Sequence, residues 1–198
     1  MRGLTSTTKS YNLFGISQAR PDVVGENAVL LIDPLVSFDA IDLGELNRCL
    51  IAWGHKMGPW NRPQFRAPAF HGMRHNGALV AVTATDQLIR ETAGGLSRDD
   101  AIELGRVCAA RPDLCRVALR LWREFVFPAV CRSRGCNWAI SYQDAVEHTG
   151  NLYRFDGWVP LGASRSGTDA RSGRKGRSKI IWGWCVDPAE RQARRVAV

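Results

Sequence analysis

Apolar residues in the first part of the chain predict a strand followed by a helix. A short apolar run at 28–32 is typical of a buried strand. The next apolar positions recur three and four residues apart, which places them on one helix face: Leu43, Leu46, Leu50 and Ile51.

An Asn-Gly pair in the next stretch predicts a β-hairpin. Asn76-Gly77 separates two apolar or alternating runs at 65–73 and 78–83. Asn-Gly suits a two-residue hairpin turn because both residues tolerate a positive φ. We therefore expect an antiparallel pair of strands there.

Residues 101–109 are predicted as a fourth strand. Ile102, Leu104 and Arg106 are expected to share one face of this segment, and Glu103, Gly105 and Val107 lie on the other. A helix that begins at Ser97 is the alternative, because Ser-x-x-Asp is a variant of the capping box.

The second half of the chain alternates helical and strand-like patterns. Pro112-Asp113 opens an amphipathic helix that Pro128 ends or kinks. Its apolar face comprises Leu114, Val117, Ala118, Leu121, Trp122, Phe125 and Val126. A strand at 137–142, a helix at 145–155 and strands at 157–162 and 179–184 follow. This order predicts an α+β domain around a mixed sheet, and makes helix-only and all-β classes poor alternatives.

Length and composition fit one domain with a substantial core. The 198 residues are 45% hydrophobic. We expect a flexible arm at 1–27, a folded domain at 28–187 and a short, frayed basic tail at 188–198. No apolar run reaches the ~18 residues that span a bilayer, and residues 1–19 lack the apolar core of a signal peptide. The expected protein is soluble and cytoplasmic, with no membrane partner.

The charge of the chain favours polyanionic partners. Its net charge is +8, and its pI is about 9.6. Nucleic acid and phosphorylated cofactors are therefore the leading partner classes. A Gly/Ser-rich loop at 163–179 suits contact with DNA phosphates, and a solubilising disordered loop is the alternative. The cations of this basic loop are Arg165, Arg171, Arg174, Lys175, Arg177 and Lys179.

Polar and aromatic side chains crowd the end of one predicted strand. Tyr142, Asp144 and His148 lie within seven residues, and Tyr153 follows them. Open α/β sheets bind ligands at the carboxyl ends of strands, so these residues are candidates for proton transfer. The structural alternative is that Asp144 or Thr149 caps a helix while the aromatic residues fill the core.

This segment resembles the Mom-like proteins of phages and prophages, a divergent branch of the GCN5-related N-acetyltransferase (GNAT) fold. The matching features are Ser141-Tyr-x-Asp144, His148-Thr-Gly-x-x-Tyr153, Gly157-Trp158 before a strand, and the Gly/Arg-rich segment that leads to Ile-Trp-Gly-Trp184. A weaker resemblance extends over about residues 35–186. It implies a GNAT-like mixed central sheet with helices on both faces. The type member of the family modifies adenine in DNA, which protects phage DNA against restriction enzymes.

The resemblance also implies binding residues. A GNAT site threads the donor's pantetheine arm beside the fourth strand, so the candidate donor contacts are Arg106, Val107, Cys108 and Arg111. The donor is acetyl-CoA or another activated acyl or aminoacyl compound. His55 joins the catalytic candidates. Iron has been proposed for members of the family, and its ligands here would be His55 and Asp144.

These inferences predict a transferase that moves a small acyl or aminoacyl group to the exocyclic amine of a DNA base, with adenine as the favoured base. Asp144 or His148 would remove a proton, and Tyr142 or Tyr153 would donate one to the leaving group. The target base has to be flipped out or single-stranded. Two other classes stay open: an acetyltransferase for a small amine or protein, and a non-catalytic DNA-binding anti-restriction module. A homodimer is also left open.

Overall fold

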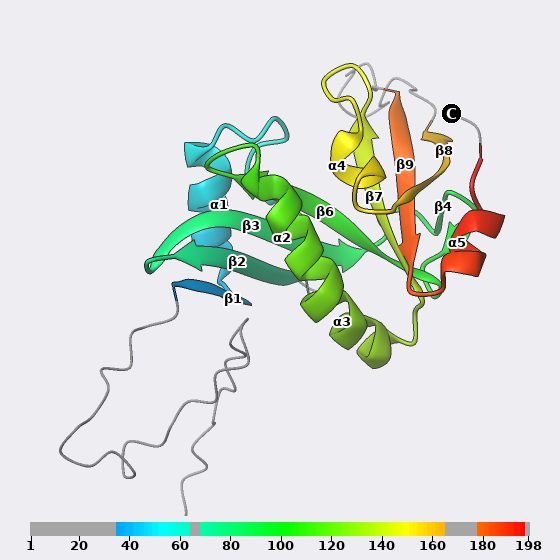
Figure 1. The fold of residues 1–198 in the computed structure, drawn as a ribbon, viewed down its shortest axis with the longest axis horizontal. Coiled ribbons are helices and arrows are strands. Elements are labelled where there is room, and N and C mark those ends of the chain that lie inside the picture. Colours follow the sequence, from blue (N-terminus) through cyan, green and yellow to red (C-terminus); the bar gives the residue numbers. More distant parts are fainter. Residues whose placement is uncertain (1–34, 64–67, 165–177, 197–198) are drawn as a thin grey trace, which may run out of the picture.

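The structure is a computed structural model that describes residues 35–63, 68–164 and 178–196 (Figure 1). Its centre is a seven-stranded sheet in the order β1-β2-β3-β6-β7-β9-β8. Every neighbouring pair is antiparallel except β6 and β7, which are parallel. The strands are β1 (Val36–Ala40), β2 (Ala69–His75), β3 (Ala78–Gln87), β6 (Ala101–Ala109), β7 (Trp138–Asp144), β8 (Val159–Ser164) and β9 (Lys179–Cys185). The predicted α+β class and mixed sheet are confirmed.

Helices cover both faces of this sheet, as predicted (Figure 1). On one face α1 packs on β2, β3 and β6, and on the other α2 packs on β3 and β6. A small hairpin of β4 (Thr92–Ala93) and β5 (Leu96–Ser97) adds to the core on the α1 side. The helical segments are α1 (Leu43–Ala52), α2 (Leu114–Leu121), the π-helical turn η3 (Trp122–Val126), α3 (Phe127–Arg134), α4 (Asn151–Arg154) and α5 (Pro188–Ala193). None of the described helices is long and apolar enough to cross a membrane.

The first half of the chain follows the sequence pattern closely. Asn76 and Gly77 have φ values of 48° and 76°, as a two-residue hairpin turn between β2 and β3 requires. Residues 101–109 form β6, so the alternative of a helix from Ser97 is wrong. Ser97 instead makes a turn in which its backbone N–H and its hydroxyl both donate to Asp100. The strand expected at 28–32 and the arm at 1–27 lie outside the described residues.

Pro128 does not end the helical segment, so that alternative is wrong. The chain stays helical to Arg134, where Gly135 terminates it with φ 70°. The irregularity comes just before the proline, where the N–H of Phe127 bonds back to the carbonyl of Trp122 in a π turn. Pro128 has no N–H to donate, and it stands in the first turn of α3, where none is needed.

Two predictions for the last third of the chain need correction. The helix expected at 145–155 is confined to α4. The Asp144 side chain accepts the N–H of Val146, and Gly150 has a positive φ of 78°, so turns replace the first half of that helix. The tail expected to be frayed forms α5, because Asp187 caps it and Pro188 occupies its first turn.

Candidate functional site

The two parallel strands of the sheet separate along their length. β6 pairs with β7 only where Ala101–Glu103 faces Trp138–Ile140, although both strands continue well beyond (Figure 1). Past that point β6 stays paired with β3 and β7 stays paired with β9. The edge of β6 beyond Glu103 therefore pairs with no strand in the described part of the chain. β6 and β7 are therefore parallel strands that diverge toward their carboxyl ends.

A pair of hydroxyl groups lies in this opening, on the α2 side. The Ser141 hydroxyl, on β7, donates to the Leu104 carbonyl of β6 at 2.9 Å. The Tyr153 hydroxyl is 2.8 Å from the Ser141 oxygen, and Tyr153 is the donor because the serine proton is already used. Tyr153 is buried, with its ring stacked on Trp182 at 5.6 Å. Burial raises the pKa of Tyr153 to about 12, so its proton stays in place at neutral pH.

Gln143 holds the loop between β7 and α4 in place. Its amide nitrogen donates to the His148 carbonyl at 2.6 Å, and its amide oxygen accepts from the Trp182 indole at 2.7 Å. Gly150 is required here, since a Cβ at its positive φ would lie 2.5 Å from the Gln143 oxygen. The backbone position of His148 is therefore fixed by the core.

Charged residues that sequence analysis did not single out lie on the α1 side of the opening. Glu103 is buried on β6 and pairs with Arg62, which also lies 3.8 Å from the buried Asp86 of β3. The guanidinium groups of Arg62 and Arg106 lie over the Trp60 ring, 4.6 and 5.3 Å from its centroid. The prediction that Arg106 shares the face of Ile102 and Leu104 is wrong. Glu103 and Arg106 both face α1 because the register with β3 shifts between them. Alternation along 101–109 could have flagged Glu103, but nothing local indicates Arg62 as its partner.

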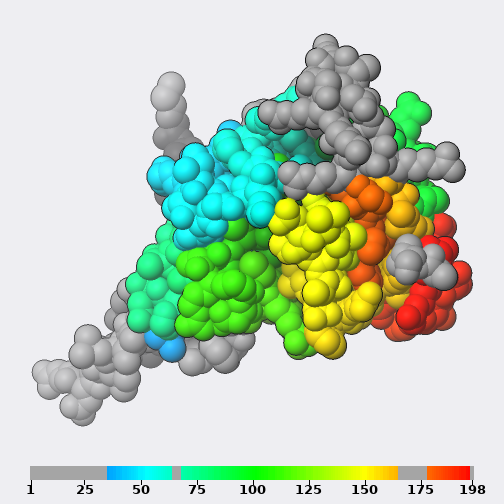
Figure 2. Space-filling model, turned by 90° about the horizontal axis from the view of Figure 1, so that it is seen from above, coloured from blue at the N-terminus to red at the C-terminus, as the bar shows by residue number. Residues whose placement is uncertain are grey.

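The end of α1 meets the loop after β7. Figure 2 shows the α1 region, in cyan, beside the β7–α4 segment, in yellow, and Lys56 bridges them through Glu147 at 2.7 Å. Burial, with smaller effects of the nearby Arg106 and His148, lowers the pKa of His55 to about 4. His55 is therefore neutral at pH 7. Its Nδ1 accepts the N–H of Met57 at 3.2 Å.

Tyr142 and Asp144 lie on the same side of the sheet as Glu103. Burial raises the pKa of Tyr142 to about 12, and Lys179 lies over its ring at 5.9 Å. The Asp144 side chain accepts the N–H of Val146 in the turn after β7, and the helix that it was alternatively expected to cap begins only at Asn151. The structure thus brings His55, Arg106 and His148 together on the α1 side and separates them from Tyr153 on the α2 side.

Comparison with known structures decides what this architecture is. An N-acetyltransferase from Staphylococcus aureus matches with a TM-score of 0.53 and 11% identity, over 77% of this chain and 99% of that one. A protein from Desulfovibrio desulfuricans described as an acetyltransferase of the GNAT family matches with a TM-score of 0.51 and 15% identity, over 77% of this chain and 99% of that one. The chain has the GNAT fold.

A third match carries a ligand. A protein from Salmonella typhimurium described as an acetyltransferase, solved with acetyl-CoA as its cofactor, has a TM-score of 0.51 and 13% identity over 77% of this chain and 95% of its own. No protein-family model matches the sequence, and a search of curated proteins finds no match. At these identities the likeness establishes the GNAT fold alone.

The residues expected to contact a donor in this GNAT fold do not form one cluster. Arg106 is buried on the α1 side, and its Nη1 donates to the Gly105 carbonyl at 2.7 Å. Val107 packs with the opposite core, beneath α2. Cys108 is buried on the α1 side, and burial raises the pKa of its thiol to about 11. Arg111 is exposed before α2 and pairs with Asp113 at 2.5 Å.

The remaining expectations concern iron and the basic loop. The described residues hold no group of three or more His, Cys, Asp or Glu side chains arranged to bind a metal. His55 and Asp144 alone are too few ligands for iron, so we assign no step to a metal. Five cations of the basic loop, at 165–177, lie outside the described residues. Lys179 begins β9.

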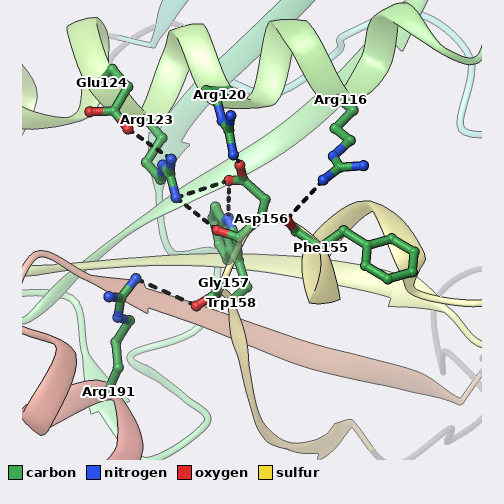
Figure 3. Close-up of polar contacts among 9 residues, drawn as sticks. All are labelled: Arg116, Arg120, Arg123, Glu124, Phe155, Asp156, Gly157, Trp158 and Arg191. Atoms are coloured by element: carbon green, nitrogen blue, oxygen red, sulfur yellow. Dashed lines mark hydrogen bonds and ion pairs between the residues drawn. The ribbon is translucent and has the colours of Figure 1, made fainter.

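A buried carboxylate fixes the turn that carries Tyr153 (Figure 3). Asp156 accepts the Trp158 indole N–H at 3.1 Å and lies 3.4 Å from Arg120 and 3.5 Å from Arg123. Arg123 also donates to the Asp156 backbone carbonyl at 2.7 Å. Burial raises the pKa of Asp156, whereas Arg123, Trp158 and Arg120 lower it. The α4 turn is thus clamped onto α2 and η3.

Proposed function

We propose that this protein transfers a small acyl or aminoacyl group from a thioester donor to the exocyclic amine of a DNA base. The opening between β6 and β7, with the Ser141–Tyr153 hydroxyl pair inside it, carries the proposal. Solved GNAT proteins of the same fold include one with acetyl-CoA bound. An extended donor arm fits the free edge of β6, because that edge offers backbone groups without a strand partner.

An acyl-CoA donor would supply an activated carbonyl and a thiolate leaving group. In the proposed mechanism, Tyr153 protonates the leaving sulfur. Burial keeps Tyr153 protonated, and its proton reaches the opening through Ser141. In this relay the Ser141 proton turns from the Leu104 carbonyl to the sulfur while Tyr153 passes its own proton to Ser141. Tyr142 has a similarly raised pKa and lies on the α1 side with His148, so it is the alternative acid.

The acceptor amine must lose a proton as it forms the amide bond. We assign that proton to His148, because Nδ1 of His55 is already engaged with the Met57 N–H and Asp144 caps a turn. The net charge of +8 supports a polyanionic acceptor. A duplex base cannot reach a cleft within the sheet, so the acceptor base is flipped out or single-stranded.

Mass spectrometry of nucleosides tests the function directly. DNA from cells that express the protein should contain an acylated or aminoacylated base that is absent from cells with an empty vector, and His148→Ala should greatly reduce it. A small-amine or protein acetyltransferase would consume acetyl-CoA and leave DNA unmodified. A non-catalytic DNA-binding module would bind DNA without any modified nucleoside. Either result would refute the proposed function.

The basic loop is expected to contact DNA phosphates. Replacing Arg171, Arg174 and Arg177 with Ala should lower the log–log salt slope of DNA binding by roughly one unit for each phosphate that is no longer neutralised. A matched control removes three exposed arginines elsewhere: Arg48, Arg132 and Arg195. Binding isotherms at several salt concentrations measure both slopes. Equal slopes for the two triple variants would show that the loop makes no specific phosphate contacts.

A further inference from the structure

Three buried polar atoms beside the opening have neither a hydrogen-bond nor an ion-pair partner among the described residues. They are Nε1 of Trp60, Nε of Arg106 and Oε2 of Glu103. Nη1 of Arg62 also makes no hydrogen bond there, but it is paired with Asp86 at 3.8 Å. These residues are only 3%, 5% and 2% exposed. Folded proteins rarely leave a buried donor or acceptor unpaired, because each such group costs about 1–3 kcal/mol. Three together at one place indicate a site that a ligand completes.

Neighbouring residues hold this cluster in position. Asn47 of α1 binds the backbone of Trp60 at both its N–H and its carbonyl, at 2.6 and 3.3 Å. Gly105 admits the indole, since a Cβ there would lie 3.0 Å from the ring. Glu103 uses its other carboxylate oxygen to pair with Arg62. It is also the last residue of β6 that pairs with β7, so the cluster adjoins the start of the opening.

The unpaired atoms define the chemistry of the ligand. Two are donors and one is an acceptor. An alkylammonium group offers only donors, so it would leave the Trp60 and Arg106 N–H groups unpaired. A carboxylate offers only acceptors and would face the Glu103 charge. An amine attached to a heteroaromatic ring, beside a ring nitrogen, supplies both kinds of group.

We propose that Trp60, Glu103 and Arg106 form the acceptor pocket and recognise an exocyclic amine next to a ring nitrogen, as on adenine. The amine donates to Glu103, and the ring nitrogen accepts from Trp60 or Arg106. This assignment rests on the proposed function and specifies its acceptor: a neutral aromatic amine rather than an aliphatic one. It also places that amine at the mouth of the opening in which the donor arm would lie.

Two oligonucleotides of equal charge test the pocket. One is a single strand that contains adenine, and the other carries purine, which lacks the amine, at the same positions. The full-length protein should bind the adenine strand about tenfold or more tightly, because purine cannot make the hydrogen bond to the charged Glu103. Phosphate contacts are the same in both strands, so they do not contribute to the difference in affinity.

Glu103→Gln should remove this preference. Because Arg62 only donates, the Gln oxygen turns to Arg62 and its NH₂ group then faces the ligand amine. The preference should fall to within about twofold. Glu45→Gln, which removes the same charge from the capping box of α1, should keep it. An unchanged preference in Glu103→Gln, or none in the wild type, overturns the pocket.

A second variant keeps the test valid if Glu103→Gln does not fold. Trp60→Phe should weaken binding of both strands by a similar factor, since both retain the ring nitrogens. Trp184→Phe also removes a buried unpaired indole N–H, but elsewhere in the core, and should bind as the wild type does. Equal binding by both Phe variants overturns the pocket.

Nucleoside analysis separates the pocket from the reaction. Acylated base without an adenine preference refutes the pocket and leaves the proposed function standing. An adenine preference that Glu103→Gln abolishes, without any acylated base, supports the pocket and refutes the transfer.

Discussion

Tyr153→Phe should lower the rate of acyl transfer by about 10² to 10⁴, the usual cost of removing a proton-transfer group. The substitution keeps the ring contacts with Trp182 and Trp158. Ser141 also keeps its bond to the Leu104 carbonyl, so the opening between β6 and β7 is preserved. Single-turnover assays with a thioester donor and a single-stranded adenine oligonucleotide measure the rate, and thermal unfolding checks that the fold is intact.

The pH profile gives this prediction a second readout. Because the pKa of Tyr153 is raised to about 12, its proton is retained throughout the neutral and mildly alkaline range. The wild-type rate should therefore show no fall that reports deprotonation of this tyrosine up to about pH 10. Tyr142→Phe is the comparison, and a larger loss there than in Tyr153→Phe would assign the acid to Tyr142. Equal activity of wild type and Tyr153→Phe would refute the acid role.

Local sequence patterns were sufficient for most of the sheet. The Asn76-Gly77 turn and the alternation along 101–109 predict β2, β3 and β6, because strand pairing there follows from turn chemistry and burial. The helical spacing of apolar residues gave a wrong prediction at 145–150. There the backbone hydrogen-bonds to the Asp144 and Gln143 side chains and forms turns instead of a helix. Gln143 ties His148 to Trp182 of β9, a contact between residues far apart in sequence.

Local sequence likewise indicated some residues of the candidate site but not the contacts between them. Tyr153 could be nominated from its short distance in sequence to the strand end. Its pairing with Ser141 depends on how the α4 turn folds back over β7, which no local pattern reveals. Glu103 and Trp60 come together only because α1 and its following segment pack over a register shift in β6. Long-range packing, rather than propensity, assembles the α1 side of the site.

Asp156→Ala should cost about 3–5 kcal/mol in the free energy of unfolding, the penalty of breaking a buried ion pair by removing one partner. The substitution leaves the Trp158 indole N–H and the Arg123 guanidinium, which is 12% exposed, without their carboxylate (Figure 3). Urea unfolding measures the loss. Asp113→Ala removes another Asp–Arg pair next to the same helix but in an exposed position, and it should leave the unfolding midpoint close to that of the wild type. Equal losses in the two variants would show that Asp156 does not clamp the α4 turn.

Asp156→Asn should cost less than Asp156→Ala. The difference in unfolding free energy between wild type and Asp156→Asn should depend on pH with a defined sign. Asn keeps an oxygen for the Trp158 indole and avoids burying a charge. Burial raises the pKa of Asp156 above its unfolded value of about 3.8, so the folded state binds the proton more tightly. The stability that this group contributes is then fully present below that unfolded value, and it is lost as the pH rises through the folded pKa. The advantage of wild type over Asp156→Asn should therefore be larger at pH 4 than at pH 7. An advantage that grows toward pH 7 would mean that pairing with Arg120 and Arg123 outweighs burial, and that the carboxylate is held ionised in the folded protein.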